Sequence, residues 1–82
     1  MKNSRDAVEK ETGFIIRRDG EYLIGTILYS TDLRWSWSPY DAWKTRRITD
    51  ARLVAGATGG EMVLFNPILG RIWEIDINEN MA

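Results

Sequence analysis

The chain contains neither cysteine nor histidine among its 82 residues, and this absence constrains what it can fold into. A chain of this length buries only about 60–65% of the surface that its unfolded form exposes. Because no disulfide and no thiolate-bound metal can add stability, apolar packing has to hold the fold together. The four tryptophans, three tyrosines and two phenylalanines are therefore the bulky side chains from which we expect a core to be built.

The same absence removes several kinds of catalytic and metal site. A Ser–His–Asp triad, a Cys–His pair, an imidazole acid or base and the usual zinc ligand sets all need residues that this chain lacks. Carboxylates remain, and Glu74, Asp76 and Glu79 could approach a hard cation. Acidic residues at alternate positions of a strand are, however, typical of a solvated face. We therefore expect no enzyme, no catalytic or metal-binding residue and no cofactor.

The sequence does not indicate a membrane protein. Residues 1–11 are charged throughout and contain no apolar region typical of a signal peptide. No apolar run approaches the ~20 residues that a membrane-spanning helix needs. We expect a cytoplasmic protein, in the host cytoplasm if a phage encodes it, with no membrane partner.

The charge is nearly balanced, but it is distributed unevenly along the chain. The formal net charge is −1, from 11 basic and 12 acidic residues. Residues 12–60 carry seven basic and five acidic groups, whereas residues 61–82 carry one basic and four acidic groups. This asymmetry is too mild to favour a nucleic-acid partner by itself.

Alternating apolar residues predict two antiparallel hairpins and a separate strand. The first hairpin joins strands at 13–18 and 21–29 through Asp19-Gly20, residues that tolerate a tight turn. Both faces of the return strand are apolar, so we expect it to lie in the centre of the sheet. Residues 61–65 and 71–77 predict the second hairpin. The separate strand carries Leu33, Trp35 and Trp37 on one side.

Two helical segments are indicated by their capping residues. Ser38-Pro39 followed by Asp41 is typical of a capped first turn and predicts a short helical turn near 39–44. Thr49-Asp50 predicts the start of the main helix, over about 50–58, and Gly59-Gly60 its end. Gly56, inside that helix, suggests close approach of a bulky neighbour. We expect the helix to face the sheet with Ala51, Val54, Ala55 and Thr58.

These elements predict a single α+β domain. It comprises a sheet of four or five mainly antiparallel strands, with the main helix on one face and the helical turn beside it. We place the domain at 13–77, a flexible lead at 1–12 and a polar tail at 78–82. A small open barrel closed by the tryptophan strand is the alternative architecture. Because one helix covers only one face of the sheet, an apolar face would remain for a partner.

Aromatic and basic residues are concentrated in segment 34–47, which holds three of the four tryptophans. The preferred interpretation is that these rings form the core of a chain without disulfides. The alternatives are a protein-binding hot spot, since tryptophan and arginine are enriched there, and a single-stranded nucleic-acid site. Arginines at 17, 18, 46 and 47 could form one positive rim, or could simply pair with acidic neighbours. The candidate partner-binding residues are Arg17, Arg18, Arg34, Trp35, Trp37, Tyr40, Trp43, Arg46 and Arg47.

The order of these motifs resembles that of small accessory proteins carried by phages and prophages. The resemblance covers most of residues 13–76, and the residues that carry it serve packing, capping and turns. It implies a compact, non-enzymatic cytoplasmic protein that binds a host component, as anti-CRISPR and other anti-defence inhibitors do. Its residues are Gly13-Phe-Ile-Ile, Tyr22-Leu, Trp37-Ser-Pro-Tyr-Asp-Ala42, Ala51 to Ala55 with Gly59-Gly60, Val63-Leu-Phe-Asn-Pro67 and Gly70-Arg-Ile72.

Three functions are consistent with the sequence. The leading hypothesis is an accessory protein that inhibits or modulates a host protein complex by direct contact. A second is a nucleic-acid- or nucleotide-binding module that uses segment 34–47. A third is a self-associating structural protein, a homodimer through the apolar face or through a sheet edge if the tryptophan strand lies there.

Overall fold

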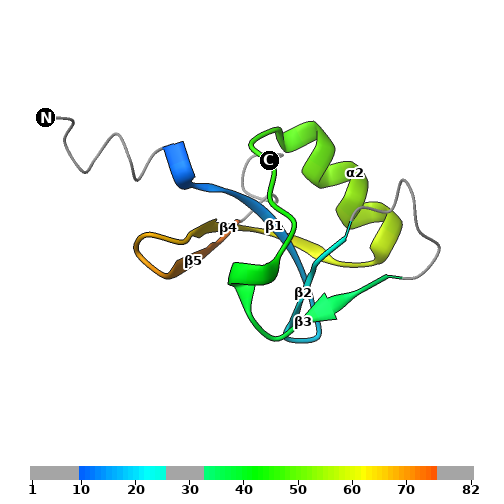
Figure 1. Cartoon of the computed structure of the whole chain (residues 1–82). Helices are drawn as coiled ribbons and strands as arrows, with labels where there is room; N and C mark the ends of the chain where they lie inside the picture. Colours follow the sequence, from blue (N-terminus) through cyan, green and yellow to red (C-terminus); the bar gives the residue numbers. More distant parts are fainter. Residues whose placement is uncertain (1–9, 26–32, 76–82) are drawn as a thin grey trace, which may run out of the picture.

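A computed structural model describes residues 10–25 and 33–75, and it contains one antiparallel sheet and one main helix. The strands lie in the order β3-β2-β1-β4-β5, and every neighbouring pair is antiparallel. This confirms the predicted α+β class (Figure 1). The elements in chain order are β1 (Gly13–Arg18), β2 (Glu21–Leu23), β3 (Trp35–Ser36), the 3₁₀ helix η1 (Pro39–Asp41), α2 (Ile48–Thr58), β4 (Glu61–Asn66) and β5 (Arg71–Glu74).

The middle strand of the sheet is β1, and the return strand of the first hairpin, β2, also lies inside the sheet, between β1 and β3. The residues of β1 from Gly13 to Arg17 pair with β4, and on its other side Arg17 and Arg18 pair with β2. Phe14 forms an additional bridge with Thr45 on that side. The return strand β2 ends at Leu23, although the next residue, Ile24, still donates its backbone N–H to the carbonyl oxygen of Arg34 in the same register with the chain before β3. The part of that predicted strand from residue 26 to residue 29 lies outside the described residues.

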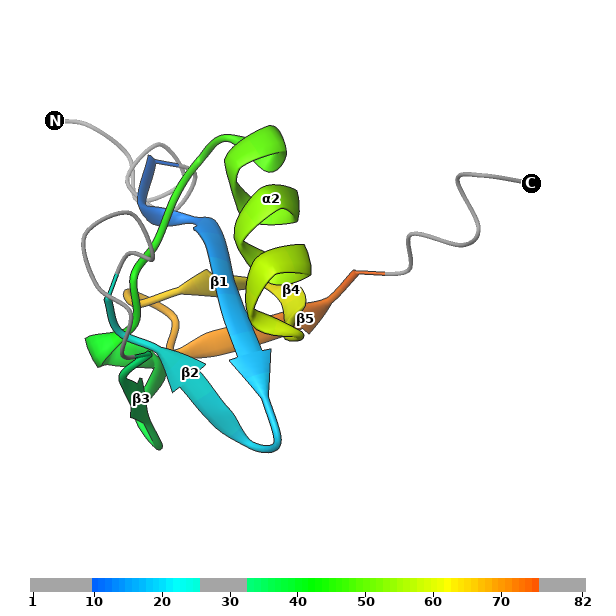
Figure 2. The same cartoon turned by 90° about the vertical axis from the view of Figure 1, so that its right-hand side faces the viewer.

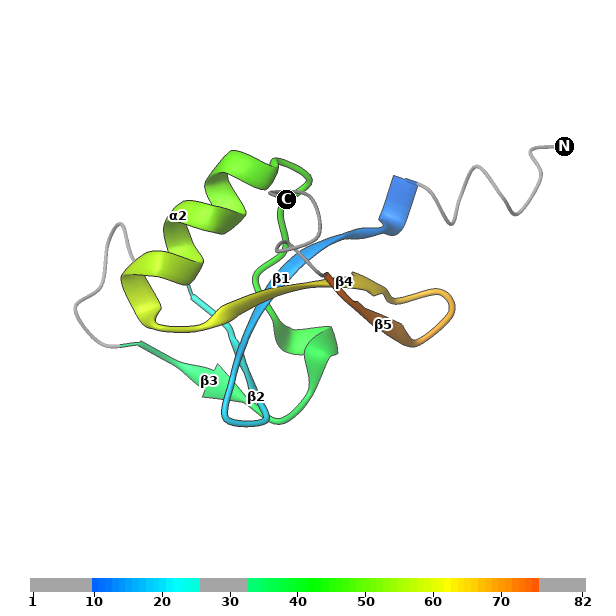
Figure 3. The same ribbon diagram turned by 180° about the vertical axis from the view of Figure 1, so that it is seen from behind.

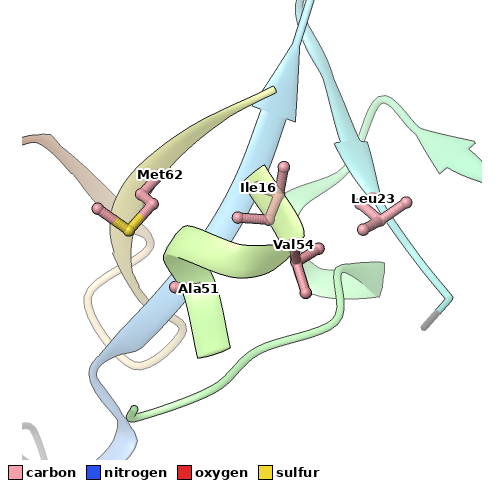
Figure 4. Packing of buried hydrophobic residues seen from close by; sticks show 5 residues of the cluster. All are labelled: Ile16, Leu23, Ala51, Val54 and Met62. Carbon is pink, nitrogen blue, oxygen red and sulfur yellow. The ribbon is translucent and has the colours of Figure 1, made fainter. Parts of the chain in front are cut away.

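Helix α2 covers one face of the sheet and closes the larger core cluster. Ile16, Leu23 and Met62 project from the sheet towards Ala51 and Val54 of the helix (Figure 4). Thr58 on the same side is also buried, and its hydroxyl donates to the carbonyl oxygen of Val54. The predicted helical stripe is therefore confirmed.

The opposite face of the sheet carries a second buried cluster, formed by Ile15, Val63 and Phe65. Ala42 packs against this cluster, and Tyr40 contacts Phe65 edge to face. Figure 3 shows η1 and α2 on opposite sides of β1. The expectation of a free apolar face is therefore wrong, because the chain covers much of this face with its own turn.

The caps of the two helical segments differ in how well the sequence predicts them. Ser38 caps η1 as predicted: its Oγ accepts a hydrogen bond from the Tyr40 N–H, and Pro39 occupies the first turn. The turn ends at Asp41, earlier than predicted. Helix α2 begins at Ile48, earlier than Thr49-Asp50 suggests, and its N-cap residue makes no side-chain hydrogen bond to the helix. No helix in the described ranges is long and apolar enough to cross a membrane.

The close neighbour that we expect at Gly56 is not there. Gly56 is exposed, and a Cβ built on it meets no described atom within 4 Å. Gly59 also has open space around it, but its φ of 73° is in the left-handed region. The two glycines therefore differ in backbone conformation and not in available space.

This difference predicts opposite effects for the same substitution at two nearby positions. Gly56→Ala should raise the free energy of unfolding by about 1 kcal/mol, because glycine is a poor helix former. Gly59→Ala should lower it by about 1–2 kcal/mol, because alanine resists a left-handed backbone. Urea unfolding followed by circular dichroism measures both. Destabilisation by Gly56→Ala would contradict the open environment of that residue.

Candidate protein-binding surface

The tryptophans of segment 34–47 divide between the core and the surface. Trp35 pairs with Leu23 across β3 and β2 and packs against the helix-side cluster. Trp43 packs against the same cluster, and its backbone N–H donates a hydrogen bond to the Leu23 carbonyl oxygen at 2.8 Å. Both rings are half-buried. Two of the candidate partner-binding residues, Trp35 and Trp43, therefore mainly help to form the core.

Trp37 lies outside the core, contrary to the predicted alternation, with 75% of its surface exposed. The regular strand ends at Ser36, and the Oγ of that serine accepts a hydrogen bond from the Ser38 N–H at 3.1 Å. This bond turns the chain towards η1, so Trp37 does not continue the strand. Its ring lies against the β1–β2 turn, where a Cβ on Gly20 would come within 3.5 Å of its Cζ3.

Tyr40 is exposed by 62% and is nevertheless held in place. Its ring meets Phe65 at a centroid distance of 5.1 Å and an interplanar angle of 88°. A Cβ on Gly70 would lie 2.8 Å from the Tyr40 hydroxyl oxygen, so the tyrosine approaches the β4–β5 turn closely. That turn also exposes Ile68 by 55% and Leu69 by 53%.

Together, Trp37, Tyr40, Ile68 and Leu69 form what we call the η1 surface. Trp37 lies near Gly20 and Tyr40 lies near Gly70, so η1 is placed between the two hairpin turns, as Figures 1 and 3 show. The sequence interpretation missed Ile68 and Leu69, although two aliphatic residues inside a turn are an unusual pattern. Turns are normally polar, so such residues are a usable signal for a contact surface.

Arg17 and Arg18 have structural partners. Arg17 donates hydrogen bonds to Glu61 at 2.6 Å and to Glu74 at 2.5 Å, and so joins β1, β4 and β5. The hydrogen bond to Glu74, followed by that to Glu61, raises the pKa of the Arg17 guanidinium above its already high usual value. Arg18 donates a hydrogen bond to the carbonyl oxygen of Thr58 at the end of α2. Its guanidinium carbon Cζ lies 4.2 Å from the centre of the Trp35 ring.

The four arginines considered from the sequence as one positive rim differ in their position and in their contacts. Arg46 and Arg47 follow Thr45, which bridges to Phe14 near the start of β1, whereas Arg17 and Arg18 lie at its other end. Because a strand rises about 3.3 Å per residue, the two pairs are separated along β1. Arg34, Arg46 and Arg47 are exposed and form no ion pair with any other described residue.

Neither a metal-binding group of side chains nor a likeness to known proteins indicates a further candidate site. Within residues 10–25 and 33–75, no group of three or more acidic side chains is arranged to hold a metal ion. Glu74, considered from the sequence as a cation ligand, instead pairs with Arg17. Compared with protein-family models, curated proteins and solved structures, the chain shows no significant match.

The unequal exposure of the tryptophans can be measured in solution. We expect Trp37→Phe to remove the largest share of acrylamide quenching of the tryptophan fluorescence, because this ring is the most exposed one described. Trp43→Phe is the matched control and should reduce quenching little, since its ring is half-buried. Equal losses in the two variants would contradict the exposure of Trp37.

Proposed function

We propose that this chain is a small non-enzymatic binding protein that attaches to a partner protein through the η1 surface. The observation that carries the proposal is Trp37, a large ring left 75% exposed in a chain that needs bulky side chains for its core. Tryptophan and tyrosine are enriched in interface hot spots, where burial in the partner contributes most of the binding energy. A small domain that exposes such rings together presents a surface suited to protein contact.

Part of the η1 surface is held in place by contacts within the chain. Hydrogen bonds from Ser38 to Ser36 and from Ser36 to Asp41 hold the turn, at 3.1 Å and 3.0 Å. Tyr40 rests on Phe65, which is buried. Because these contacts already restrict the turn and Tyr40, binding through this part of the surface loses less conformational entropy.

The class of partner comes from the sequence resemblance. The resemblance implies a protein that binds a host component and inhibits or modulates it by contact, so a host complex, such as a defence complex, is the partner that we propose. A rigid aromatic surface supports this mode of action, since it can block a site without any chemical step.

The proposal is tested by removing one exposed side chain from the η1 surface and one from α2. Trp37→Ala should weaken partner binding at least ~30-fold, the effect of losing a hot-spot residue, and should change the free energy of unfolding by less than about 0.5 kcal/mol. Leu53→Ala is the matched control: Leu53 is 68% exposed on α2, and its loss should not affect binding.

The experiment compares the immobilised wild-type chain with both variants in host extract, followed by affinity measurement on the purified partner. A protein retained by the wild type and by Leu53→Ala, but lost by Trp37→Ala, is the expected result. Retention of the same protein by all three would show that the η1 surface is not the contact site. Failure of the wild type to retain any protein beyond a bare support would count against partner binding itself.

A second candidate is single-stranded nucleic acid. The exposed guanidinium groups of Arg34, Arg46 and Arg47 support it, because they have no described ion-pair partner and could contact phosphates. This function requires affinity for an oligonucleotide that falls steeply as salt rises, since phosphate contacts release counterions. Absence of binding at low salt would eliminate it.

A further inference from the structure

Both exposed aromatic rings of the η1 surface have an acidic residue close to them in the chain. Trp37, which is 75% exposed, lies near Gly20, and Asp19 is the residue next to that glycine in the β1–β2 turn. Tyr40 is followed directly by Asp41 within η1. Asp19 and Asp41 are exposed, and neither forms an ion pair with any other described residue. Each ring is thus accompanied by a carboxylate that no described cation neutralises.

The sheet face on which η1 lies is acidic as well. Figure 2 shows η1, the short green helix, beside β2 and β3 and on the side of β1 away from α2. Arg17 follows Ile15 by two residues in β1, so its side chain is on this face. There Glu61 and Glu74 share its single guanidinium, and their side chains are 61% and 76% exposed. Because one cation meets two carboxylates, the group keeps a net negative charge at the surface.

The other arginines near the η1 surface in the chain do not balance this negative charge. Arg18 donates a hydrogen bond to a carbonyl oxygen at the end of α2, on the opposite face of the sheet. Ile72 packs against the cluster beneath η1, so the preceding residue, Arg71, points to the opposite face. Arg34 precedes β3 and Trp37 follows it, so the whole strand lies between them. The η1 surface therefore combines exposed rings with local negative charge.

An aromatic ring beside a carboxylate is suited to binding an arginine side chain. A guanidinium stacks on the ring with its flat face while its N–H groups donate to the carboxylate, and the compact ammonium of lysine lacks this flat, forked shape. The chain itself contains both kinds of contact: the Cζ of Arg18 lies 4.2 Å from the centre of the Trp35 ring, and Arg17 binds two carboxylates. Arginine is also enriched in interface hot spots.

We propose that the protein which binds the η1 surface presents a basic face to it, with arginine side chains that bind between an exposed ring and the neighbouring aspartate, at Trp37 and at Tyr40. This inference rests on the proposed function, because it names the chemistry of the partner at the same surface. Complementary charge accelerates the encounter of two proteins and disfavours acidic competitors. Burial of the rings then provides the larger share of the affinity.

The chemistry can be tested on the full chain with a short synthetic peptide in which arginine alternates with glycine. In a nuclear magnetic resonance titration at low salt, this peptide should shift the indole signal of Trp37 and the backbone amides of residues 18–20 and 38–42. A peptide with citrulline in place of arginine is the matched probe, because citrulline keeps the shape of the side chain and carries no charge. Absence of shifts at the η1 surface, or equal shifts with both peptides, would overturn the proposal.

Substitution of the two aspartates tests their charge without disturbing the turns. The double variant Asp19→Asn/Asp41→Asn should bind the arginine peptide about fivefold more weakly, because charge-assisted hydrogen bonds are stronger than neutral ones. Asparagine tolerates the φ of 53° at Asp19, and at position 41 it can still accept the hydrogen bond of Ser36. Asp50→Asn removes a charge from α2 and is the matched control, which should leave binding unchanged. Equal weakening by the control would show an effect of net charge alone and contradict the proposal.

The natural partner separates this inference from the proposed function. A protein retained through Trp37 should bind the double variant more weakly, mainly through slower association, and salt should reduce the difference. A partner that depends on Trp37 but binds the double variant as tightly as the wild type would overturn the basic-partner inference and leave the proposed function intact. Binding of the arginine peptide by a chain that retains no partner protein would support the surface chemistry and count against the proposed function.

Discussion

Two adjacent isoleucines on the central strand determine how the rest of the chain has to be arranged. Ile15 and Ile16 are both completely buried, and adjacent residues of a strand point to opposite faces. Both faces of the sheet therefore need a cover. Helix α2 covers the face of Ile16, and the chain around η1 covers much of the face of Ile15 with Ala42 and Tyr40.

The unequal size of these two covers explains which aromatic side chains remain available. An eleven-residue helix provides a broad apolar stripe, and Trp35 and Trp43 complete the core beneath it. A three-residue turn provides much less. Tyr40 can rest only one edge on Phe65, and Trp37, at the entrance to the turn, reaches no cluster. The η1 surface is thus a consequence of covering a sheet face with a short segment.

The sequence predicts the elements that depend on local chemistry better than those that depend on distant contacts. Positive φ at Asp19 and Gly20 confirms the tight hairpin, as Ser38-Pro39 and Gly59 confirm their caps. The position of Trp37 could not be predicted from the alternation of apolar residues. The strand ends at a hydrogen bond from the Ser38 N–H to the Ser36 Oγ, and that alternation gives no sign of this bond. The separation of the arginines likewise depends on pairing between β1 and residues far along the chain.

Asn66 links the η1 surface to the β5 edge. Its side chain is completely buried; its Nδ2 donates to the Thr12 hydroxyl, and its Oδ1 accepts from the Leu69 N–H at 2.8 Å. These bonds fix the turn that exposes Ile68 and Leu69, and the same turn sets where β5 begins. Because a one-residue shift of a strand reverses every side chain, the register that orients Trp73 is maintained by the turn that positions Leu69. The η1 surface and the register of β5 therefore both depend on one buried amide.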